Sequence, residues 1–468
     1  MGHAGTLRLL AARARCLRGE HRRVPHRLVR HRHRVDQPRR PARVLTHHRG
    51  VDDRRVSRPH ARHADEGRRA HHHQLRARRH RHRAHSAREG GPVKNLVIVL
   101  TAVLATTAAA QTCPFRSSWP TEDWPVDLVN ADARAAEIKA LDDFAFTLVG
   151  QDGERKGLRT EGLVIIRNGR IRYERYGRGF GQNNRHLSWS VAKSYSSALV
   201  GVAVKEGLIS LDESICTYLP EYAGKPQCDI TVKDAITFGT ALGWQEEYED
   251  ASYQVSSVIA MLFGVGHRDQ LTHILNHKLV GKPGEVWNYS TGDAELASAL
   301  AQRVLEPVHG KDAFWSQFFD RFGASRTMFE FDARGTPLGG SMVYATPRDF
   351  AKFGFLYLND GCWNGERLVP ENWVRTSTTP SDVFVGYAKE TESTPSGYMW
   401  WLNKPIAEKN KPKPWADVPE DTFAALGHWG QRIIVVPSMD VVIVRTGDDR
   451  EGSMDVNELT KLALEVVK

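Results

Sequence analysis

Residues 186–207 read HLSWSVAKSYSSALVGVAVKEG, and the fold class of the chain can be argued outward from them. Small and apolar residues run from Ser190 to Lys205 and stop at Gly207, a residue that allows the left-handed conformation ending many helices. We therefore predict a helix that begins at Ser190. Positions i and i+3 lie on one face of a helix, so the Lys193 amine can reach the Ser190 hydroxyl. The helix N-terminus adds partial positive charge and free N–H groups beside that hydroxyl.

Ser190 and Lys193 are a candidate nucleophile and its candidate base. A serine hydroxyl is a weak nucleophile until a neighbouring base takes its proton. A lysine amine can be that base when burial and nearby cations lower its pKa. The pattern S-x-x-K alone equally describes an ordinary helix start with a solvated lysine, so its meaning depends on the rest of the chain.

Two further motifs follow in order: PGEVWNYSTGD at 283–293 and LGHWGQ at 426–431. Together the three motifs resemble those of the β-lactamase and penicillin-binding-protein superfamily of serine hydrolases. Tyrosine in the second motif is similar to the class C branch and to its esterase, D-aminopeptidase and 6-aminohexanoate (nylon-oligomer) hydrolase relatives. The resemblance runs from about residue 130 to the C-terminus and includes GLISLDESICTYLPEY at 207–222. ITFGTALGWQEEYED and GGSMVYATPRDFAKFGFLYLNDGCWNGERLVPENWV are most similar to the nylon-oligomer hydrolases.

The resemblance assigns a role to each matching residue. Ser190 would be the acylated nucleophile and Lys193 its base or proton relay, without a metal or cofactor. Tyr289, its phenolate stabilised by the lysine, would give a proton to the leaving group and then activate water. Lys193 and Tyr289 are best treated as a coupled pair. The backbone N–H groups of Ser190 and Gln431 would form the oxyanion hole, and Gly430 would be small so that substrate can lie against its strand.

Departures from the family pattern bear on the substrate. His428 stands where many β-lactamases have a lysine that attracts a substrate carboxylate, and Thr291 replaces an asparagine that grips the acyl side chain. Both changes favour an ester or a linear amide as the substrate over penicillins and cephalosporins. Tyr248 is, by resemblance, a further candidate for holding the substrate amide. For His428, Tyr248 and Tyr289, packing without a catalytic role is the alternative.

Three functions therefore stay open. The first is an exported serine hydrolase acting on a small-molecule ester or amide, similar to the 6-aminohexanoate-oligomer hydrolases. The second is a β-lactamase or D-alanyl-D-alanine carboxypeptidase. The third is a binding protein that recognises penicillin without turnover, although the presence of Ser190, Lys193 and Tyr289 disfavours it.

Patterning independently predicts strands at both ends of the body of the chain. Asn168-Gly169 joins two strand-like runs, and Pro437–Asp440 joins two more. These runs are 162–166, 171–176, 432–436 and 441–445, and flanking helices are predicted at 129–148 and about 454–467. We expect an α/β (α+β) protein of the β-lactamase-like fold. Its antiparallel sheet comes from both ends of the chain, with a mainly helical lobe inserted at about 208–345.

Residues 1–92 have a different composition: 26 Arg and 15 His against 7 acidic residues, with no Lys, Ile, Phe, Tyr, Trp or Asn. Such a segment cannot bury enough apolar surface to fold, so we predict disorder. The missing residue types mostly have AT-rich codons, which indicates translated GC-rich upstream DNA rather than genuine coding sequence. The alternatives are a polybasic arm for nucleic acid or anionic lipid, or metal binding at His71, His72 and His73.

Residues 93–110 have the pattern of a secretory signal peptide. One lysine precedes the apolar run Leu96–Leu104, and an Ala-x-Ala end follows. The run is too short to span a bilayer. We predict that translation starts at Val93, that cleavage occurs near Gln111, and that the product is periplasmic or secreted without a stable membrane anchor. An N-terminal segment at 111–128 would then precede the hydrolase domain at 129–468.

Beyond residue 92 the chain has 39 basic and 48 acidic residues, a net charge of −9. An acidic body argues against binding to nucleic acid. Its four cysteines, Cys113, Cys216, Cys228 and Cys362, allow three pairings in an exported protein. Cys216 and Cys228 close a short loop and are the predicted bridge, while no Cys/His spacing suggests zinc. The oligomeric state stays open.

Overall fold

A computed structural model describes residues 113–249, 252, 254–387, 389, 392–451 and 454–468. The basic segment at 1–92 and the predicted signal peptide at 93–110 lie outside these residues and stay predictions. No helix among the described residues is both long and apolar enough to cross a membrane.

The helices are α1 Ala135–Phe146, α2 Val191–Lys205, α3 Ile215–Tyr218, α4 Val232–Ile236, α5 Ser257–Leu262, α6 Gln270–Leu275, α7 Thr291–His309, α8 Ala313–Gln317, α9 Pro347–Leu358, α10 Trp373–Ser377, α11 Asp382–Tyr387 and α12 Val456–Val467. The strands are β1 Thr160–Arg167, β2 Arg170–Tyr176, β3 His186–Leu187, β4 Met328–Phe329, β5 Val343–Ala345, β6 Cys362–Trp363, β7 Glu366–Arg367, β8 Trp401–Leu402, β9 Phe423–Gly427, β10 Gln431–Val436 and β11 Val441–Gly447.

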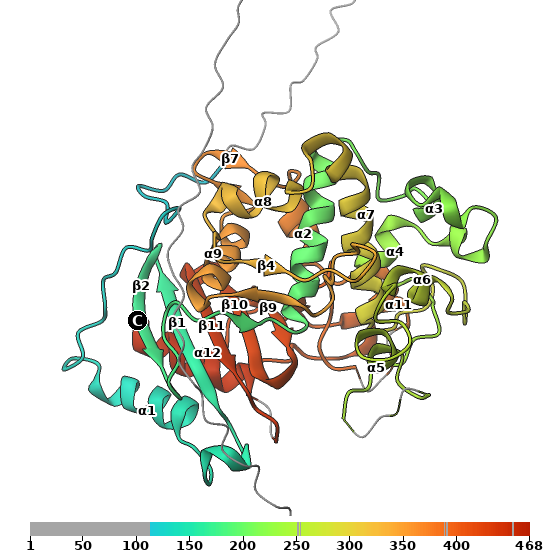
Figure 1. Ribbon diagram of the computed structural model, residues 1–468. Coiled ribbons are helices and arrows are strands. Elements are labelled where there is room, and N and C mark those ends of the chain that lie inside the picture. Colours follow the sequence, from blue (N-terminus) through green and yellow to red (C-terminus); the bar gives the residue numbers. More distant parts are fainter. Residues whose placement is uncertain (1–112, 250–251, 253, 388, 390–391, 452–453) are drawn as a thin grey trace, which may run out of the picture. The chain divides into compact units, whose positions relative to one another are not determined.

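The main sheet has six strands in the order β2-β1-β11-β10-β9-β8 (Figure 1). Every neighbouring pair is antiparallel, and Ile165 of β1 lies opposite Ile443 of β11. Strands from before α2 therefore pair with strands near the C-terminus. The predicted fold class and the sheet built from both ends of the chain are confirmed.

Successive apolar residues of the central strands point to opposite faces of this sheet, which explains why helices cover both faces. Leu163 and Ile165 pack in a core that includes side chains of α1 and α12. Val164 and Ile166 belong to the larger core that includes α2 and α9. Side chains on a strand point alternately to its two faces, so a strand buried on both faces is apolar throughout.

Several boundaries differ from the prediction for local reasons. The helix predicted at 129–148 spans Ala135–Phe146, because the Asn130 side chain accepts a hydrogen bond from the Ala133 N–H (3.0 Å) and stabilises a turn instead. Ser190 is the residue before α2 rather than its first helical residue. The second sequence motif proves to be a helix start, since Ser290 caps α7 by accepting a bond from the Asp293 N–H (2.9 Å).

The helical part of the chain brings the second motif to the first. Helices α3 to α8 lie between residues 215 and 317, and α7 packs along α2 (Figure 1). A small sheet in the order β3-β5-β4 pairs Leu187, just before the first motif, with Tyr344. The start of α2 is thus fixed from β5 on one side and from α7 on another.

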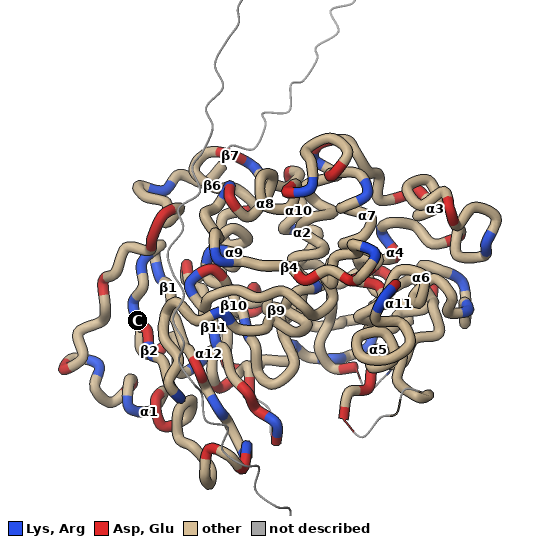
Figure 2. Tube along the Cα trace, in the orientation of Figure 1, with Lys and Arg blue, Asp and Glu red and all other residues tan. Residues whose placement is uncertain are grey.

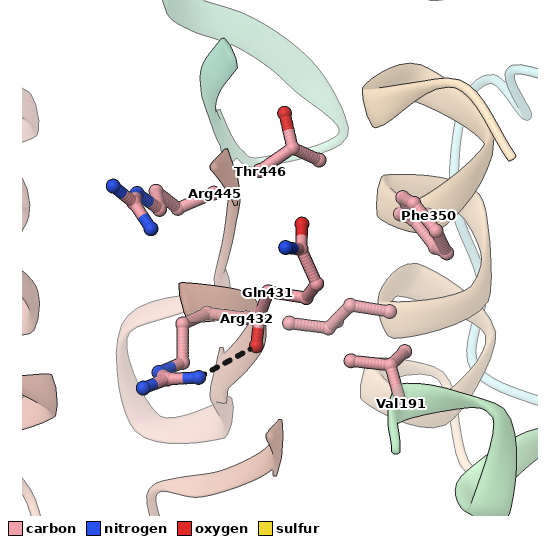
Figure 3. Close-up of a pocket in the computed structure, with 7 residues that line it drawn as sticks. Val191, Phe350, Gln431, Arg432, Arg445 and Thr446 are labelled. Carbon is pink, nitrogen blue, oxygen red and sulfur yellow. Dashed lines mark hydrogen bonds between the residues drawn. The ribbon is translucent and has the colours of Figure 1, made fainter. Parts of the chain in front are cut away.

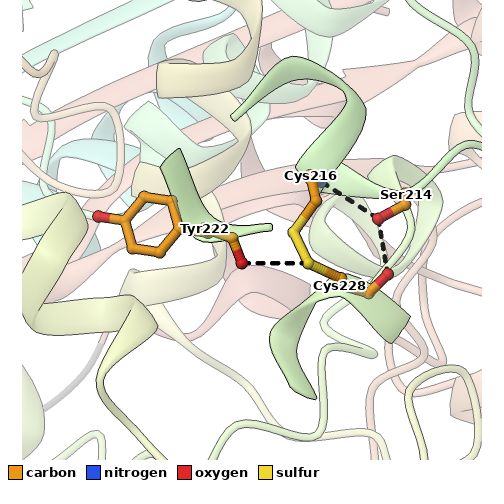
Figure 4. The surroundings of a disulfide bond; sticks show 4 residues. All are labelled: Ser214, Cys216, Tyr222 and Cys228. Atoms are coloured by element: carbon orange, nitrogen blue, oxygen red, sulfur yellow. Dashed lines mark hydrogen bonds between the residues drawn. A yellow bond between two sulfur atoms is a disulfide. The ribbon is translucent and has the colours of Figure 1, made fainter. Parts of the chain in front are cut away.

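Both disulfides lie in the part of the chain that the structure describes. Cys216–Cys228 confirms the predicted short-loop bridge, and the second bond is Cys113–Cys362. Figure 4 shows Ser214 beside the short-loop bridge, donating to the carbonyl of Cys228 (2.6 Å) and accepting from the N–H of Cys216 (3.1 Å).

Removing the long-range bridge should cost more stability than removing the short one. Cys113 and Cys362 are 249 residues apart, whereas Cys216 and Cys228 are 12 apart. In the chain-entropy account, a bridge across the longer loop restricts the unfolded chain more, by about 5 against about 3 kcal/mol. Urea unfolding of the two paired Cys→Ser variants measures the difference. Equal losses in the two variants would contradict this account.

Candidate active site

Ser190 lies at the first turn of α2, where the chain makes a strained bend. The preceding Trp189 has φ +46°, a left-handed conformation that non-glycine residues rarely adopt. Strain of this kind costs about 1–3 kcal/mol and is concentrated at functional sites. The Ser188 N–H donates to the Val343 carbonyl (2.7 Å) and anchors the bend to β5. The Ser190 hydroxyl makes no capping bond to the helix, so it can interact with other groups.

Lys193 meets that hydroxyl directly. Its Nζ donates to Ser190 Oγ at 2.9 Å, Thr291 Oγ1 at 2.8 Å and the Gly340 carbonyl at 3.0 Å. Three bonds use all the donors of an ammonium group. Burial lowers the pKa of Lys193 to about 8, although nearby carboxylates, above all Glu246, act in the opposite direction. At pH 7 about one tenth of the amine is therefore neutral.

Tyr289 completes the cluster from the turn before α7. The Lys193 Nζ lies 5.0 Å from the centre of its ring, and Phe238 and Trp401 flank the ring at 5.0 and 5.4 Å. Burial, reinforced by Glu246, raises the pKa of Tyr289 despite a hydrogen bond with Ser190. Its surroundings therefore favour the neutral phenol, whereas the resemblance implied a phenolate. The structure brings the three predicted residues together.

Thr291 is occupied within the protein. Its hydroxyl accepts the bond from Lys193 and donates to Glu246, so it serves to hold the lysine. Its bonds give Thr291 a role in holding Lys193, and its role in binding substrate stays a prediction.

Glu246 is a site residue that the sequence analysis missed. Its carboxylate accepts bonds from the Thr291 N–H (2.8 Å) and Trp244 Nε1 (2.6 Å), and lies 3.9 Å from Lys193 Nζ. The only sequence signal is its place two residues before Tyr248. Four acidic residues occur in GWQEEYED, and no pattern among them indicates which one is turned inward.

His428 and Tyr248 lie next to one another beside this cluster. Their rings stack at 4.9 Å, and His428 Nε2 is 2.8 Å from a carboxylate oxygen of Glu249. Burial lowers the pKa of His428 against the influence of Glu249, so the imidazole is neutral at pH 7. The Tyr248 hydroxyl is 3.4 Å from both Thr291 Oγ1 and Glu246 Oε1. The third motif thus presents an aromatic, uncharged ring where a lysine would present a cation.

Gly430 ends the turn between β9 and β10, and Gln431 is the first residue of β10. Gly430 has φ +90°, and a Cβ there would lie 1.9 Å from Arg445 Nη1 and 2.3 Å from Asp449 Oδ2. The buried side chains behind the turn therefore require a glycine at this position, and its role in making room for substrate stays a prediction. Figure 3 shows the side chain of Gln431 between β10 and the end of β11, where its Nε2 donates to the Gly447 carbonyl (2.6 Å).

The six-stranded sheet, the helical lobe and the Ser–Lys–Tyr cluster together define a serine-hydrolase architecture. Residues 146–468 match the family model described as Beta-lactamase, and the chain belongs to this family. Among the described residues, no group of three or more His, Cys, Asp or Glu side chains could hold a metal ion.

Within the family, the chain is 24% identical to the 6-aminohexanoate-dimer hydrolase of Paenarthrobacter ureafaciens, over 66% of this chain and 78% of the relative. The putative 6-aminohexanoate-dimer hydrolase from Bacillus anthracis is similar in structure, with TM-score 0.56, 20% identity and coverage of 74% and 87%. A family VIII carboxylesterase gives TM-score 0.51 at 17% identity, over 72% of this chain and 95% of that one. These structural matches share the fold.

The pH dependence of turnover should follow Lys193. A base must be neutral to accept a proton, so we expect kcat/KM to rise with pH through about 8 and then level off. Because the Glu246 carboxylate raises the pKa of Lys193, Glu246→Gln should move this rise to lower pH. Glu247→Gln, an equal change of charge at the exposed neighbouring residue, should leave the midpoint unchanged. A rise that stays at the same pH in Glu246→Gln would contradict this assignment.

Proposed function

We propose that the chain is an exported serine hydrolase that cleaves ester or linear amide bonds through an acyl-enzyme on Ser190. The observation that carries this proposal is the 2.9 Å contact between Lys193 Nζ and Ser190 Oγ. Lys193 is 2% exposed, and its pKa of about 8 suits a base that works near neutral pH. The relatives named 6-aminohexanoate-dimer hydrolase support an amide substrate of that kind.

In the acylation step, neutral Lys193 takes the proton from Ser190 while Oγ attacks the substrate carbonyl carbon. The carbonyl oxygen becomes an oxyanion and accepts hydrogen bonds from the N–H groups of Ser190 and Gln431. The C–O or C–N bond then breaks, and the phenol of Tyr289 gives its proton to the leaving alcohol or amine. The ammonium of Lys193 returns a proton to Tyr289, so both groups regain their starting states.

Deacylation repeats these steps with water as the nucleophile. The water gives a proton to the Lys193–Tyr289 pair as its oxygen attacks the acyl carbon. The new tetrahedral intermediate collapses, the C–Oγ bond breaks, and Ser190 recovers its proton from the same pair. The product is a free carboxylic acid. The proton that left with the alcohol or amine is thus replaced by one from water, and all three side chains regain their starting states.

The third motif supports esters and linear amides over β-lactams. His428 is uncharged at pH 7 and is bonded to Glu249, so it offers little attraction to the carboxylate of a penicillin or cephalosporin. Arg450 is a cation near His428, but its guanidinium group lies over the ring of Trp429, with the guanidinium carbon 3.0 Å from the ring centre. A neutral ester or amide substrate does not need a cation at this position.

Export is part of the proposal and is supported by cysteine usage. All four described cysteines are paired, and stable disulfides are typical of oxidising compartments. N-terminal sequencing of protein from the periplasm or medium should begin near Gln111. Material that begins at Met1 would refute the predicted start at Val93 and the signal peptide together.

Three substrates assayed side by side test the proposed activity: a p-nitrophenyl short-chain ester, the linear 6-aminohexanoate dimer and nitrocefin. We expect the ester and the dimer to be hydrolysed, with kcat/KM for nitrocefin lower than for the ester by about two orders of magnitude or more. Efficient nitrocefin turnover would favour the β-lactamase alternative. Binding of all three without turnover would favour the binding protein.

A further inference from the structure

Two buried arginines donate hydrogen bonds to carbonyl groups in the turn between β9 and β10 and at the two strand ends beside it. Arg445 Nη1 donates to the Gly430 carbonyl at 3.0 Å. Arg432 Nη1 donates to the carbonyls of Gly427 (2.8 Å) and Gln431 (2.9 Å), the second of which is dashed in Figure 3. The two guanidinium groups lie on the same side of β10 and β11 in that view, as expected for residues paired across the strands.

The position of Arg445 is fixed from several sides. Two bonds of 2.7 Å join its guanidinium to both carboxylate oxygens of Asp449, and Nε and Nη2 donate to Thr160 Oγ1 at 3.0 and 2.9 Å. Both side chains of this ion pair are fully buried. Asp449 also accepts a bond from the Arg159 N–H (2.7 Å), and its own N–H donates to the Trp429 carbonyl (3.1 Å). The ion pair thus joins β1, β11 and the turn.

The hydrogen bond from Arg445 to the Gly430 carbonyl also fixes the direction of the Gln431 N–H. The C=O of Gly430 and the N–H of Gln431 belong to one planar trans peptide unit, in which the two bonds point in opposite directions. Since Arg445 holds the oxygen, the Gln431 N–H must point away from the buried ion pair. That N–H is the second oxyanion donor of the proposed mechanism.

We propose that Arg445, clamped by Asp449, is a positioning residue that aims the Gln431 N–H into the oxyanion hole. This inference rests on the proposed function. A buried ion pair is weak grounds for stability, because desolvation offsets much of the attraction, so a positioning role accounts better for a pair at this place. It also explains Gly430, where any Cβ would displace both members of the pair.

A double substitution tests the proposal without leaving a buried charge unpaired. Removing one partner of a buried pair can unfold a protein, whereas replacing both with apolar residues of similar size is often neutral. In Arg445→Met/Asp449→Leu, we expect kcat for the p-nitrophenyl ester to fall roughly 10- to 100-fold, below the full effect of losing a donor. KM should change less than about twofold, because the oxyanion forms only in the transition state. Phosphonylation of Ser190 should slow by a similar factor.

The matched control is Arg348→Met/Glu174→Leu. Arg348 and Glu174 form a two-bond pair of 2.8 and 2.7 Å between α9 and β2, with 17% and 13% of the side chains exposed. Neither residue contacts the turn before β10. We expect this variant to keep kcat within about twofold of the wild-type value, and thermal unfolding establishes that both double variants fold.

Each outcome decides the question. A folded Arg445→Met/Asp449→Leu variant with the kcat of the control overturns the inference, and so does a rise in KM at unchanged kcat. If the wild-type protein hydrolyses the ester and Ser190→Ala does not, the proposed function survives either result. If the wild-type protein neither hydrolyses the ester nor is phosphonylated at Ser190, the proposed function fails and the inference fails with it.

Discussion

Ser190→Ala is expected to lower kcat for p-nitrophenyl ester hydrolysis by roughly 10⁴- to 10⁶-fold, the range for loss of a serine nucleophile. Without the hydroxyl no acyl-enzyme forms, and Lys193 and Tyr289 have no oxygen to deprotonate and reprotonate. Turnover by the oxyanion donors and bound water alone would remain. Steady-state rates, together with mass spectrometry after treatment with a fluorophosphonate, measure both consequences: activity and the covalent label should disappear together.

Ser194→Ala is the matched control. Ser194 lies one turn further along α2, is buried, and donates to the Met399 carbonyl (2.7 Å). The same loss of a hydroxyl there should affect stability but leave the fluorophosphonate label at Ser190 in place. A Ser190→Ala variant with full activity, or a label on another residue, would refute the proposed mechanism.

Lys193→Met is expected to have the second largest effect, a fall in kcat of roughly 10²- to 10⁴-fold. The substitution keeps an unbranched side chain of similar length but removes the base and the bond to Ser190 Oγ. The rise of activity through pH about 8 should vanish with it, since the titrating amine is gone. Thermal stability should fall as well, because the buried Gly340 carbonyl and Thr291 hydroxyl lose their partner.

Lys352 provides a lysine of similar burial for comparison. It is 3% exposed, lies on α9, and donates to the carbonyls of Thr121 (3.0 Å) and Gly323 (2.6 Å). Lys352→Met should lower stability, because those carbonyls lose their partner, while kcat stays near the wild-type value. If both lysine variants lost stability and activity in parallel, the base assigned to Lys193 would be indistinguishable from a structural lysine.

Much of the sheet could be predicted because its signals are local. Asn168-Gly169 marks a hairpin whatever surrounds it, since both residues accept positive φ, and they do so here. The apolar runs on either side of this turn can be predicted as strands from their own residues, without knowledge of their partners. Which strands pair is a longer-range matter, and a single sheet from both ends of the chain was inferred from the strands at each end and the helices between them.

The site residues likewise fall into those that local sequence predicts and those that it does not. Ser190 and Lys193 are three residues apart, so one helix turn brings them together. Tyr289 is about a hundred residues away and was placed by its motif, not by geometry. Glu246 could not be identified, because nothing local distinguishes a carboxylate that turns towards the lysine from the solvated acidic residues beside it.

From the sequence alone, the candidate site residues and the order of the strands along the chain could be predicted, because helix periodicity and turn preferences act over a few residues. Only the tertiary structure decided the environment of those residues. Burial lowers the pKa of Lys193 and raises that of Tyr289, and the side chains of Arg445 and Asp449 make Gly430 necessary. Desolvation and close packing arise from segments that are far apart in sequence, so they exist only after the chain has folded.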